Sequence, residues 1–154
     1  MKPGTFTQLF VHLVIAVKHR EYLLNQDVRP EIFKYIGGIV KQRKHKLYIV
    51  NGYQDHVHIL LGLNSDDKIS DLVGSIKKNS AEYIKEKQLI KGKFQWQEGY
   101  GAFTYSKSQI EKVYKYIAQQ EEHHRKKTFK EEYVNFLKKY GIQFDEKYLF
   151  EFYE

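Results

Sequence analysis

The sequence predicts an α+β protein of the ferredoxin-like type, with an antiparallel sheet built in the order βαββαβ and further helices at the C-terminus. Two observations support this fold class. Apolar residues alternate in several short segments, as in strands, and recur every three to four residues in the segments between them, as in amphipathic helices. A short connection joins two of the strand segments, which indicates an antiparallel hairpin. Helices would then cover one face of the sheet, and we expect the other face to be open for a site or a partner.

The first strand is predicted within residues 6 to 18. Its apolar residues, among them Val11 and Leu13, alternate onto one face, whereas His12 and Val14 lie on the other. We expect the apolar face to pack against the helices. His12 is therefore expected on the face that the helices leave open.

A helix and a hairpin are predicted next. Ile32 and Ile36 recur at helical spacing, and Pro30 is tolerated in the first turn of a helix. Two strand-like segments follow, and the connection between them is too short for a crossover. The predicted bounds are residues 30 to 44 for the helix, and 47 to 51 and 56 to 63 for the strands.

The second half of the predicted sheet begins with an amphipathic helix over residues 68 to 87. Leu72 lies on its apolar stripe, while Lys77 and Lys78 lie elsewhere on its surface. A fourth strand is predicted within residues 94 to 105, where glycines allow a bend or a bulge.

Two helices are predicted at the C-terminus. The first runs from about residue 109 to residue 125. Thr128 and Glu131 have the spacing of a capping box, so the last helix is expected to begin there. Gly141 is suited to the left-handed conformation that ends a helix, and we expect the last helix to stop near it.

The composition predicts one folded domain over residues 1 to 154. The length is typical of a single domain, and 42% hydrophobic with 29% charged residues is a globular balance. Neither an export signal nor a membrane-spanning segment is evident, so we expect a cytoplasmic protein. The chain has no cysteine, which excludes disulfides and thiolate metal sites. Any metal must therefore be held by nitrogen or oxygen ligands.

The net charge favours a polyanionic partner. Lys and Arg total 26 against 19 Asp and Glu, which leaves a net charge of +7. Such a surface attracts nucleic acid through the release of counterions. A solvated lysine-rich surface without a specific partner explains the same charge, so individual residues have to decide between the two.

His56 and His58 are the first candidates for a functional site. Two residues apart on a strand, they project from the same face and could share one metal ion, while Val57 and Ile59 point the other way. The apolar reverse face is expected to pack on the helices, so the imidazoles belong to the open face, where we expect His12 to join them. For this pattern taken alone, the alternative is that the histidines only form hydrogen bonds with one another or with the backbone.

Tyr116 and Gln120 strengthen the case for a site. They lie four residues apart and therefore on one side of their predicted helix. Tyr114 and Ile117 belong to the apolar stripe of that helix, whereas Tyr116 and Gln120 lie roughly 70 to 110° from its centre. The pattern thus predicts that Tyr114 is a core residue and that Tyr116 is not.

With these motifs the sequence resembles the transposases of the insertion-sequence 200/605 class, the smallest HUH enzymes, in which U stands for a hydrophobic residue. DHVHILLGL at residues 55–63 looks like the HUH strand of the family, and YIAQQ at 116–120 is similar to its nucleophile motif, Tyr-Ile-x-x-Gln. GYGAFTYSKSQ at 99–109 and QEEHHRKKTFKEEY at 120–133 also read like family segments. The tyrosine follows the histidines, as in these transposases, and Gln120 stands where rolling-circle initiators commonly have lysine.

The resemblance implies a chemistry for these residues. His56, His58 and Gln120 would bind one divalent cation, Mg²⁺ or Mn²⁺, in contact with the scissile phosphate. Tyr116 would attack the phosphorus and form a 5′-phosphotyrosine, so that DNA is cut and rejoined without ATP. Imidazole and amide donors also suit zinc, so the residues alone leave the metal identity open.

The resemblance also implies the partners. The substrate would be single-stranded DNA with hairpins near element ends, and family members are homodimers in which the tyrosine helix can serve the histidines of the partner. Gly99 and Gly101 precede that helix and could allow such an exchange, although a tight turn explains them equally well. The candidate DNA-contacting residues are His12, Lys77, Lys78, Arg125 and Lys126. For the basic residues the alternative is a solvated helix face, and for His12 it is a core position or a hydrogen bond to a ligand histidine.

Two other functions remain open on the sequence. One is a non-catalytic module of the same fold that binds single-stranded nucleic acid by stacking bases on exposed aromatic residues, which the 16% aromatic content permits. The histidines on the third strand weigh against it. The other is a domesticated HUH endonuclease that cuts host repeats, which would carry the same motifs.

Overall fold

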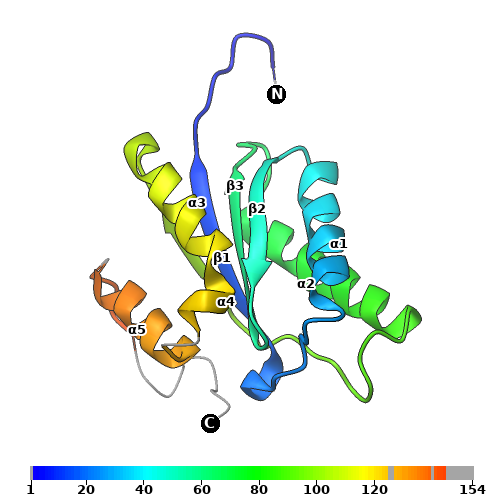
Figure 1. Cartoon of the computed structure of the whole chain (residues 1–154). Coiled ribbons are helices and arrows are strands. Elements are labelled where there is room, and N and C mark those ends of the chain that lie inside the picture. Colours follow the sequence, from blue (N-terminus) through cyan, green and yellow to red (C-terminus); the bar gives the residue numbers. More distant parts are fainter. Residues whose placement is uncertain (1, 125–126, 140, 145–154) are drawn as a thin grey trace.

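A four-stranded antiparallel sheet forms the centre of the molecule, with the strand order β2-β3-β1-β4 (Figure 1). The computed structural model describes residues 2–124, 127–139 and 141–144. β1 and β3 occupy the two central positions, as the ferredoxin-like order requires, so the predicted fold class is confirmed. The strands are β1 (Phe10–Ala16), β2 (Lys46–Gly52), β3 (His56–Gly62) and β4 (Gly101–Thr104).

The predicted helices are present, with one of them divided in two. Their bounds are α1 (Arg29–Gln42), α2 (Ile69–Glu86), α3 (Ile110–Ala118), α4 (Gln120–His123) and α5 (Phe129–Lys139), with 3-10 turns η1 (Lys18–Arg20) and η2 (Lys107–Gln109). The fourth strand is shorter than the segment in which it was predicted, and an isolated bridge between Val17 and Trp96 precedes it. Within the described ranges, the helices lack the combination of length and apolar character needed to cross a membrane.

α1 and α2 pack on one face of the sheet and close the main hydrophobic core (Figure 1). The alternation predicted for the central strands is confirmed, because Val11 and Leu13 of β1 and Val57 and Ile59 of β3 are buried in this core. Burying an aliphatic side chain of this size contributes about 1.5–3 kcal/mol, so the register of these strands is strongly determined. The histidines of the same strands consequently face the opposite side of the sheet.

The second face of the sheet is covered, not open as expected. α3, α4 and α5 lie over it (Figure 1). A smaller apolar cluster fills the space between, with Val14 and Phe103 from the sheet meeting Tyr133 and Leu137 from α5. The C-terminal helices carry apolar stripes that have to be buried, and the second face of the sheet is the surface on which they pack.

The helix predicted over residues 109 to 125 breaks between α3 and α4. Gln119 has φ −101° and ψ 24°, outside the helical region. The side-chain amide of Asn51, on β2, donates to the carbonyl oxygens of Ile117 (2.8 Å) and Ala118 (3.2 Å). These hydrogen bonds satisfy carbonyl groups that the end of a helix leaves without partners inside the helix. The break therefore has its own stabilising contact with the sheet.

The ends predicted for the last helix are confirmed. Thr128 Oγ1 accepts a hydrogen bond from the backbone N–H of Glu131 at 3.2 Å, as a helix cap requires. Gly141 has φ 62°, the left-handed conformation expected just beyond the end of a helix. α5 therefore begins and ends where local sequence signals place it.

Candidate functional site

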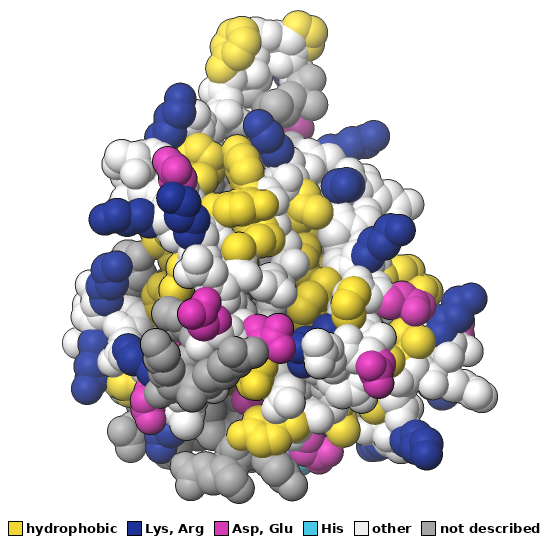
Figure 2. Space-filling model, viewed as in Figure 1, with side chains coloured by type: hydrophobic (Ala, Val, Ile, Leu, Met, Phe, Trp, Pro, Cys, Tyr) yellow, Lys and Arg dark blue, Asp and Glu magenta, His cyan; other side chains and the backbone are white. Residues whose placement is uncertain are grey.

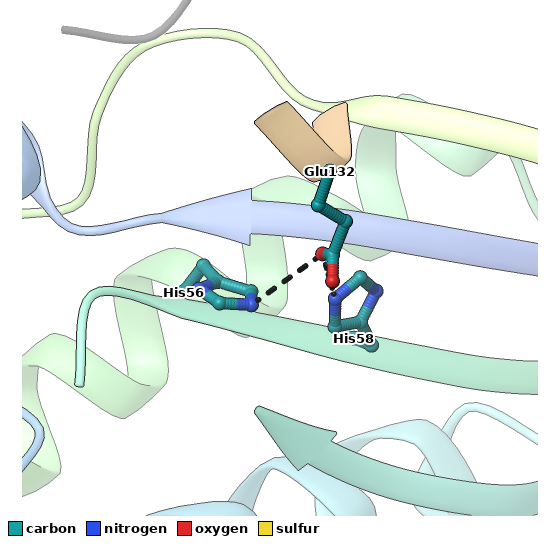
Figure 3. Close-up of side chains that lie close together, drawn as sticks. All are labelled: His56, His58 and Glu132. Atoms are coloured by element: carbon teal, nitrogen blue, oxygen red, sulfur yellow. Dashed lines mark hydrogen bonds and ion pairs between the residues drawn. The ribbon is translucent and has the colours of Figure 1, made fainter. Parts of the chain in front are cut away.

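β3 presents His56 and His58 on the second face of the sheet, as the strand period predicts (Figure 3). Both side chains are fully buried. His56 Nδ1 lies 2.7 Å from Asp55 Oδ1, and His58 Nδ1 lies 2.7 Å from His12 Nε2. His12 Nδ1 is in turn 2.9 Å from the hydroxyl of Tyr105. Three histidines thus converge on this face, and the Nε2 atoms of His56 and His58 face the C-terminal helices.

Glu132, on α5, lies between these two histidines and was not identified from the sequence (Figure 3). Its Oε1 atom is 2.9 Å from His58 Nε2 and 3.7 Å from His56 Nε2. One ligand atom from each of the three residues lies within 4.8 Å of the others, so the group could hold a metal ion. The sequence does contain a signal. Glu132 falls on the apolar stripe of α5, three residues after Phe129 and four before Phe136, where a carboxylate needs a buried partner.

Gln120 joins the group from the start of α4. Its side-chain oxygen is 3.0 Å from His56 Nε2 and 3.0 Å from His124 Nε2. His124, also missed in the sequence, lies 3.1 Å from Glu132 Oε2. Its position four residues after Gln120 places both on one side of a helical turn, which is the signal that could have identified it. The predicted ligands His56, His58 and Gln120 are therefore brought together, with Glu132 and His124 added to them.

Burial determines much of the electrostatics of this cluster. It lowers the pKa of His12 well below the ordinary value, and the nearby His58 adds to this effect. Burial also lowers the pKa of His58, although Glu132 opposes the shift. Burial by itself would raise the pKa of Glu132, but the charge of His58 and the hydrogen bonds from His124 and His58 outweigh it and lower that pKa. Glu132 is therefore an ionised carboxylate, which is the form of this group that binds a metal.

Tyr116 lies beside this cluster, half-buried on α3. Its ring is edge-on to that of His58, with 5.9 Å between the centroids, and edge-on to Phe136 of α5 at 5.4 Å. Burial raises the pKa of the Tyr116 phenol, and the negative charge of Glu132 raises it further. The resting side chain is therefore a neutral phenol, which becomes a strong nucleophile only when its proton is removed.

Tyr114 is not a core residue, contrary to the prediction. Its side chain is 43% exposed, whereas Ile117 is fully buried. Ile110 and Val113 are partly buried against the apolar cluster of the second face. The predicted stripe was centred too far toward Tyr114, because α3 packs with the side that carries Tyr116 toward the sheet and α5.

A groove of about 300 Å³ between α3 and α5 leads to Tyr116 and Glu132. Three exposed lysines line it, with Lys112 on α3, Lys127 ahead of α5 and Lys139 at the end of α5. Lysines that line the same groove as a tyrosine form an electrostatic environment that suits the phosphates of a nucleic-acid strand.

The residues predicted to contact DNA lie apart from this groove or outside the described residues. Lys77 and Lys78 are on α2, which packs on the other face of the sheet from the histidines. The Lys77 ammonium group donates to two backbone carbonyls of the segment ahead of β4, at 2.8 and 2.6 Å, while Lys78 is exposed. His12 is buried and contacts a candidate ligand histidine, in agreement with the alternative considered for it. Arg125 and Lys126 lie outside the described residues.

Comparison with known proteins relates this site to one family. The family model described as "Transposase IS200 like" matches residues 5–120. The ISDra2 transposase TnpA of Deinococcus radiodurans is 29% identical over 122 residues, which cover 76% of this chain and 87% of that protein.

Two solved structures share the fold. A crystal structure of a transposase from Deinococcus radiodurans matches with a TM-score of 0.61 at 25% identity, covering 78% of this chain and 96% of that one. The structure of a REP-associated tyrosine transposase bound to a REP hairpin matches with a TM-score of 0.58 at 17% identity, covering 80% of this chain and 74% of that one. Because the family model spans most of the chain and includes the HUH strand, Tyr116 and Gln120, the chain belongs to the IS200-like transposase family.

Proposed function

We propose that this protein is a metal-dependent DNA transposase that cleaves and rejoins single-stranded DNA at element ends through a 5′-phosphotyrosine intermediate. The observation that carries the proposal is the position of Tyr116, whose ring is 5.9 Å from that of His58 and which lines the lysine-rich groove. The proposed nucleophile, a group of potential metal ligands and a groove lined by lysines thus lie next to one another. Membership of a transposase family supports the same function.

We propose His56, His58 and Gln120 as ligands of a divalent cation. Their donors are imidazole nitrogens and an amide oxygen, a set without thiolate that is compatible with Mg²⁺, Mn²⁺ or Zn²⁺. The closeness of Gln120 Oε1 to His56 Nε2, at 3.0 Å, supports a shared ion. A divalent cation bound there would offset the negative charge that develops on the scissile phosphate.

Tyr116 is the nucleophile of this mechanism. Its phenolic oxygen forms a bond to phosphorus, the phenol loses its proton, and the bond from phosphorus to the 3′ oxygen of the preceding nucleotide breaks. That oxygen takes up a proton and leaves as a free 3′-hydroxyl. Rejoining reverses these steps when a 3′-hydroxyl attacks the phosphotyrosine. The phosphodiester energy is conserved in the covalent link, so no nucleotide cofactor is needed.

The DNA strand is proposed to reach Tyr116 through the groove between α3 and α5. Lys112, Lys127 and Lys139 would contact its phosphates, which positions the strand without reading its sequence. The REP hairpin bound by one of the structural neighbours supports a substrate that carries hairpins.

We also propose that the protein is a homodimer. β2 and β4 are the edge strands of the sheet, and native proteins commonly cover such edges. Within the single chain, Tyr116 already lies beside His58. Catalysis inside one subunit therefore needs no exchange of helices, whereas an exchanged arrangement would need α3 to leave this position.

The rival function, a non-catalytic module that stacks bases on its sheet, receives no support from the geometry. Phe103 and Tyr105, on and next to β4, are buried beneath the C-terminal helices and are not accessible to bases. An enzyme domesticated to cut host repeats would share the site described here. Comparing cleavage of element ends with cleavage of host repeats would distinguish the proposed transposase from a domesticated endonuclease.

Tyr116→Phe and Tyr114→Phe together test the nucleophile, because each removes one hydroxyl group from the same helix. After incubation with single-stranded element-end DNA and Mn²⁺, wild type and Tyr114→Phe should give a DNA adduct that survives a denaturing gel, and Tyr116→Phe should give none. Tyr114 is exposed, so its substitution should change the free energy of unfolding by less than about 0.5 kcal/mol. An adduct in Tyr116→Phe would assign the nucleophile to another residue, and no adduct in wild type would contradict the tyrosine mechanism.

A further inference from the structure

We propose that Glu132 is an additional metal ligand, so that α5 binds the cation from the side opposite the HUH strand. The inference rests on the proposed function, since it concerns the same metal. It goes beyond the ligand set His56, His58 and Gln120, because those residues lie within the family match at residues 5–120 and Glu132 lies beyond it. A ligand from α5 would therefore come from a helix that the family match does not include.

The two carboxylate oxygens of Glu132 have different surroundings. Oε1 faces the HUH imidazoles, 2.9 Å from His58 Nε2 and 3.7 Å from His56 Nε2. Oε2 is held from behind by His124 Nε2 at 3.1 Å and by the Gln120 amide group, which donates to it at 3.5 Å. One oxygen is thus anchored while the other points between the imidazoles, which is the arrangement expected of a ligating carboxylate supported by outer hydrogen bonds.

Charge and burial point to the same role. Glu132 is only 4% exposed, and a buried carboxylate is costly unless it is paired or coordinates a metal. Two neutral imidazoles and an amide would leave both positive charges of a divalent cation uncompensated in a buried site. A carboxylate ligand removes half of that charge and gives Glu132 a strong partner. The carboxylate and the cation would therefore each reduce the free-energy cost of burying the charge of the other.

Apolar contacts hold α5 over the site independently of Glu132. The ring of Phe129 stacks on that of His56 with 3.9 Å between centroids and 5° between planes. Tyr133 and Leu137 are buried in the apolar cluster of the second face. Because these contacts remain when the carboxylate is replaced by an isosteric amide, Glu132→Gln is expected to fold with α5 in place.

Calorimetric titration of the full chain with Mn²⁺ tests the assignment. Glu132→Gln should weaken Mn²⁺ binding by at least roughly tenfold to a hundredfold, the range seen when only a group that supports the ligands of a metal site is lost. Glu131→Gln is the matched control, because it removes the same charge from the neighbouring, exposed position of α5 and should change the affinity less than about twofold. Unchanged affinity in Glu132→Gln would overturn the proposal, and tighter binding would instead identify Glu132 as a competitor of the metal.

Hydrogen exchange provides a second readout that does not depend on activity. Addition of Mn²⁺ should slow amide exchange in α5 of wild type and Glu131→Gln but not in Glu132→Gln. Equal slowing in all three proteins would contradict a bond between α5 and the metal. If Mn²⁺ binding depends on Glu132 but wild type forms no Tyr116 adduct, the ligand assignment stands and the proposed function fails. If the adduct forms and Glu132→Gln binds Mn²⁺ normally, the function stands and the ligand assignment fails.

Discussion

At the scale of single residues, His56 and His58 each direct one ring nitrogen to the site and use the other in a hydrogen bond. For the Nε2 atom of His58 to hold a metal, its Nδ1 must carry the proton and donate to His12 Nε2, at 2.7 Å. His12 Nδ1 must then carry its own proton and donate to the hydroxyl oxygen of Tyr105, at 2.9 Å. Asp55 fixes His56 in the same way through Nδ1. One consistent set of tautomers therefore presents both Nε2 lone pairs to the site.

His12→Asn tests this chain of hydrogen bonds. The loss of the acceptor for His58 Nδ1 should weaken Mn²⁺ binding by roughly tenfold, without abolishing it, because all the proposed ligands remain. Tyr105→Phe removes only the outer hydroxyl and leaves the bond between His12 and His58, so its effect on Mn²⁺ affinity should be smaller. Calorimetry measures both affinities, and melting temperatures in EDTA report any general loss of stability. A larger effect of Tyr105→Phe than of His12→Asn would contradict this order of the hydrogen bonds.

The sequence was sufficient to predict which residues of the strands face the site, but not that Glu132 of α5 meets them. The position of His56 and His58 follows from the period of a strand, and the role of Gln120 was implied by the resemblance of residues 116–120 to the nucleophile motif of the family. Glu132 depends on where α5 packs against the sheet, which is a tertiary contact that no local pattern encodes. Its presence on an apolar stripe was the one indication of a buried partner.

At the scale of elements, the C-terminal helices show how tertiary contacts alter local preferences. The helical periodicity continues from α3 into α4, yet Asn51 of β2 binds the last carbonyls of α3 and the chain turns at Gln119. The same packing turns α3 so that Tyr114 is exposed. The hairpin of β2 and β3, by contrast, follows from its short connection, so it could be predicted without knowing these contacts.

Hydrogen bonds to the carboxylate of Asp67, which we call the polar clamp, link the end of α1 to the start of α2. Arg43, directly after α1, donates to both carboxylate oxygens of Asp67 at 2.8 and 2.6 Å. His45 Nε2 lies 2.8 Å from the same carboxylate, and the backbone N–H of Lys68, at the start of α2, donates to it at 2.9 Å. The hydrogen bond from Arg43, followed by that from His45, lowers the pKa of Asp67 well below its ordinary range. The ends of both helices thus share one ionised group.

The pKa of Asp67 predicts how stability depends on pH. Because the folded-state pKa lies below the unfolded value of about 3.9, the stabilisation by this carboxylate is complete above that value and is lost as the pH falls toward the folded-state pKa. Asp67→Asn should therefore be less stable than wild type near neutral pH, and the difference should shrink in acid below about pH 4. Urea unfolding midpoints across this range measure it. Asp27→Asn, at an exposed position away from this contact, should follow wild type, and a difference for Asp67→Asn that stays constant with pH would contradict the clamp.

At the scale of the whole molecule, the positive charge on the face seen in Figure 2 is not gathered in one patch and does not by itself locate the DNA. Figure 2 shows Lys and Arg side chains along both flanks of the visible face, with acidic groups among them. The net charge of +7 therefore supports attraction to nucleic acid in general. Among the described residues, lysines and Tyr116 together line the groove between α3 and α5, and this makes the groove the expected path of the strand.

The salt dependence of DNA binding can separate this path from the opposite face of the sheet. The variant Lys112→Ala/Lys127→Ala/Lys139→Ala removes the lysines that line the groove. If each contacts one phosphate, the slope of log affinity against log salt for single-stranded DNA should fall by about 2, because each phosphate contact contributes about 0.7 for single strands. Fluorescence anisotropy in the absence of divalent metal measures binding without cleavage.

The matched control is Lys78→Ala/Lys85→Ala/Lys87→Ala, which removes the same charge from exposed positions on or next to α2. Long-range attraction is weakened equally in both variants, so a difference between their slopes reports direct phosphate contacts. The control should keep the slope of wild type within about 0.5. Equal slopes for the two variants would mean that the lysines act only through net charge. A reduced slope in the control alone would place the strand on the face of α2, where Lys78 was predicted from the sequence to contact DNA, and would exclude the groove as its path.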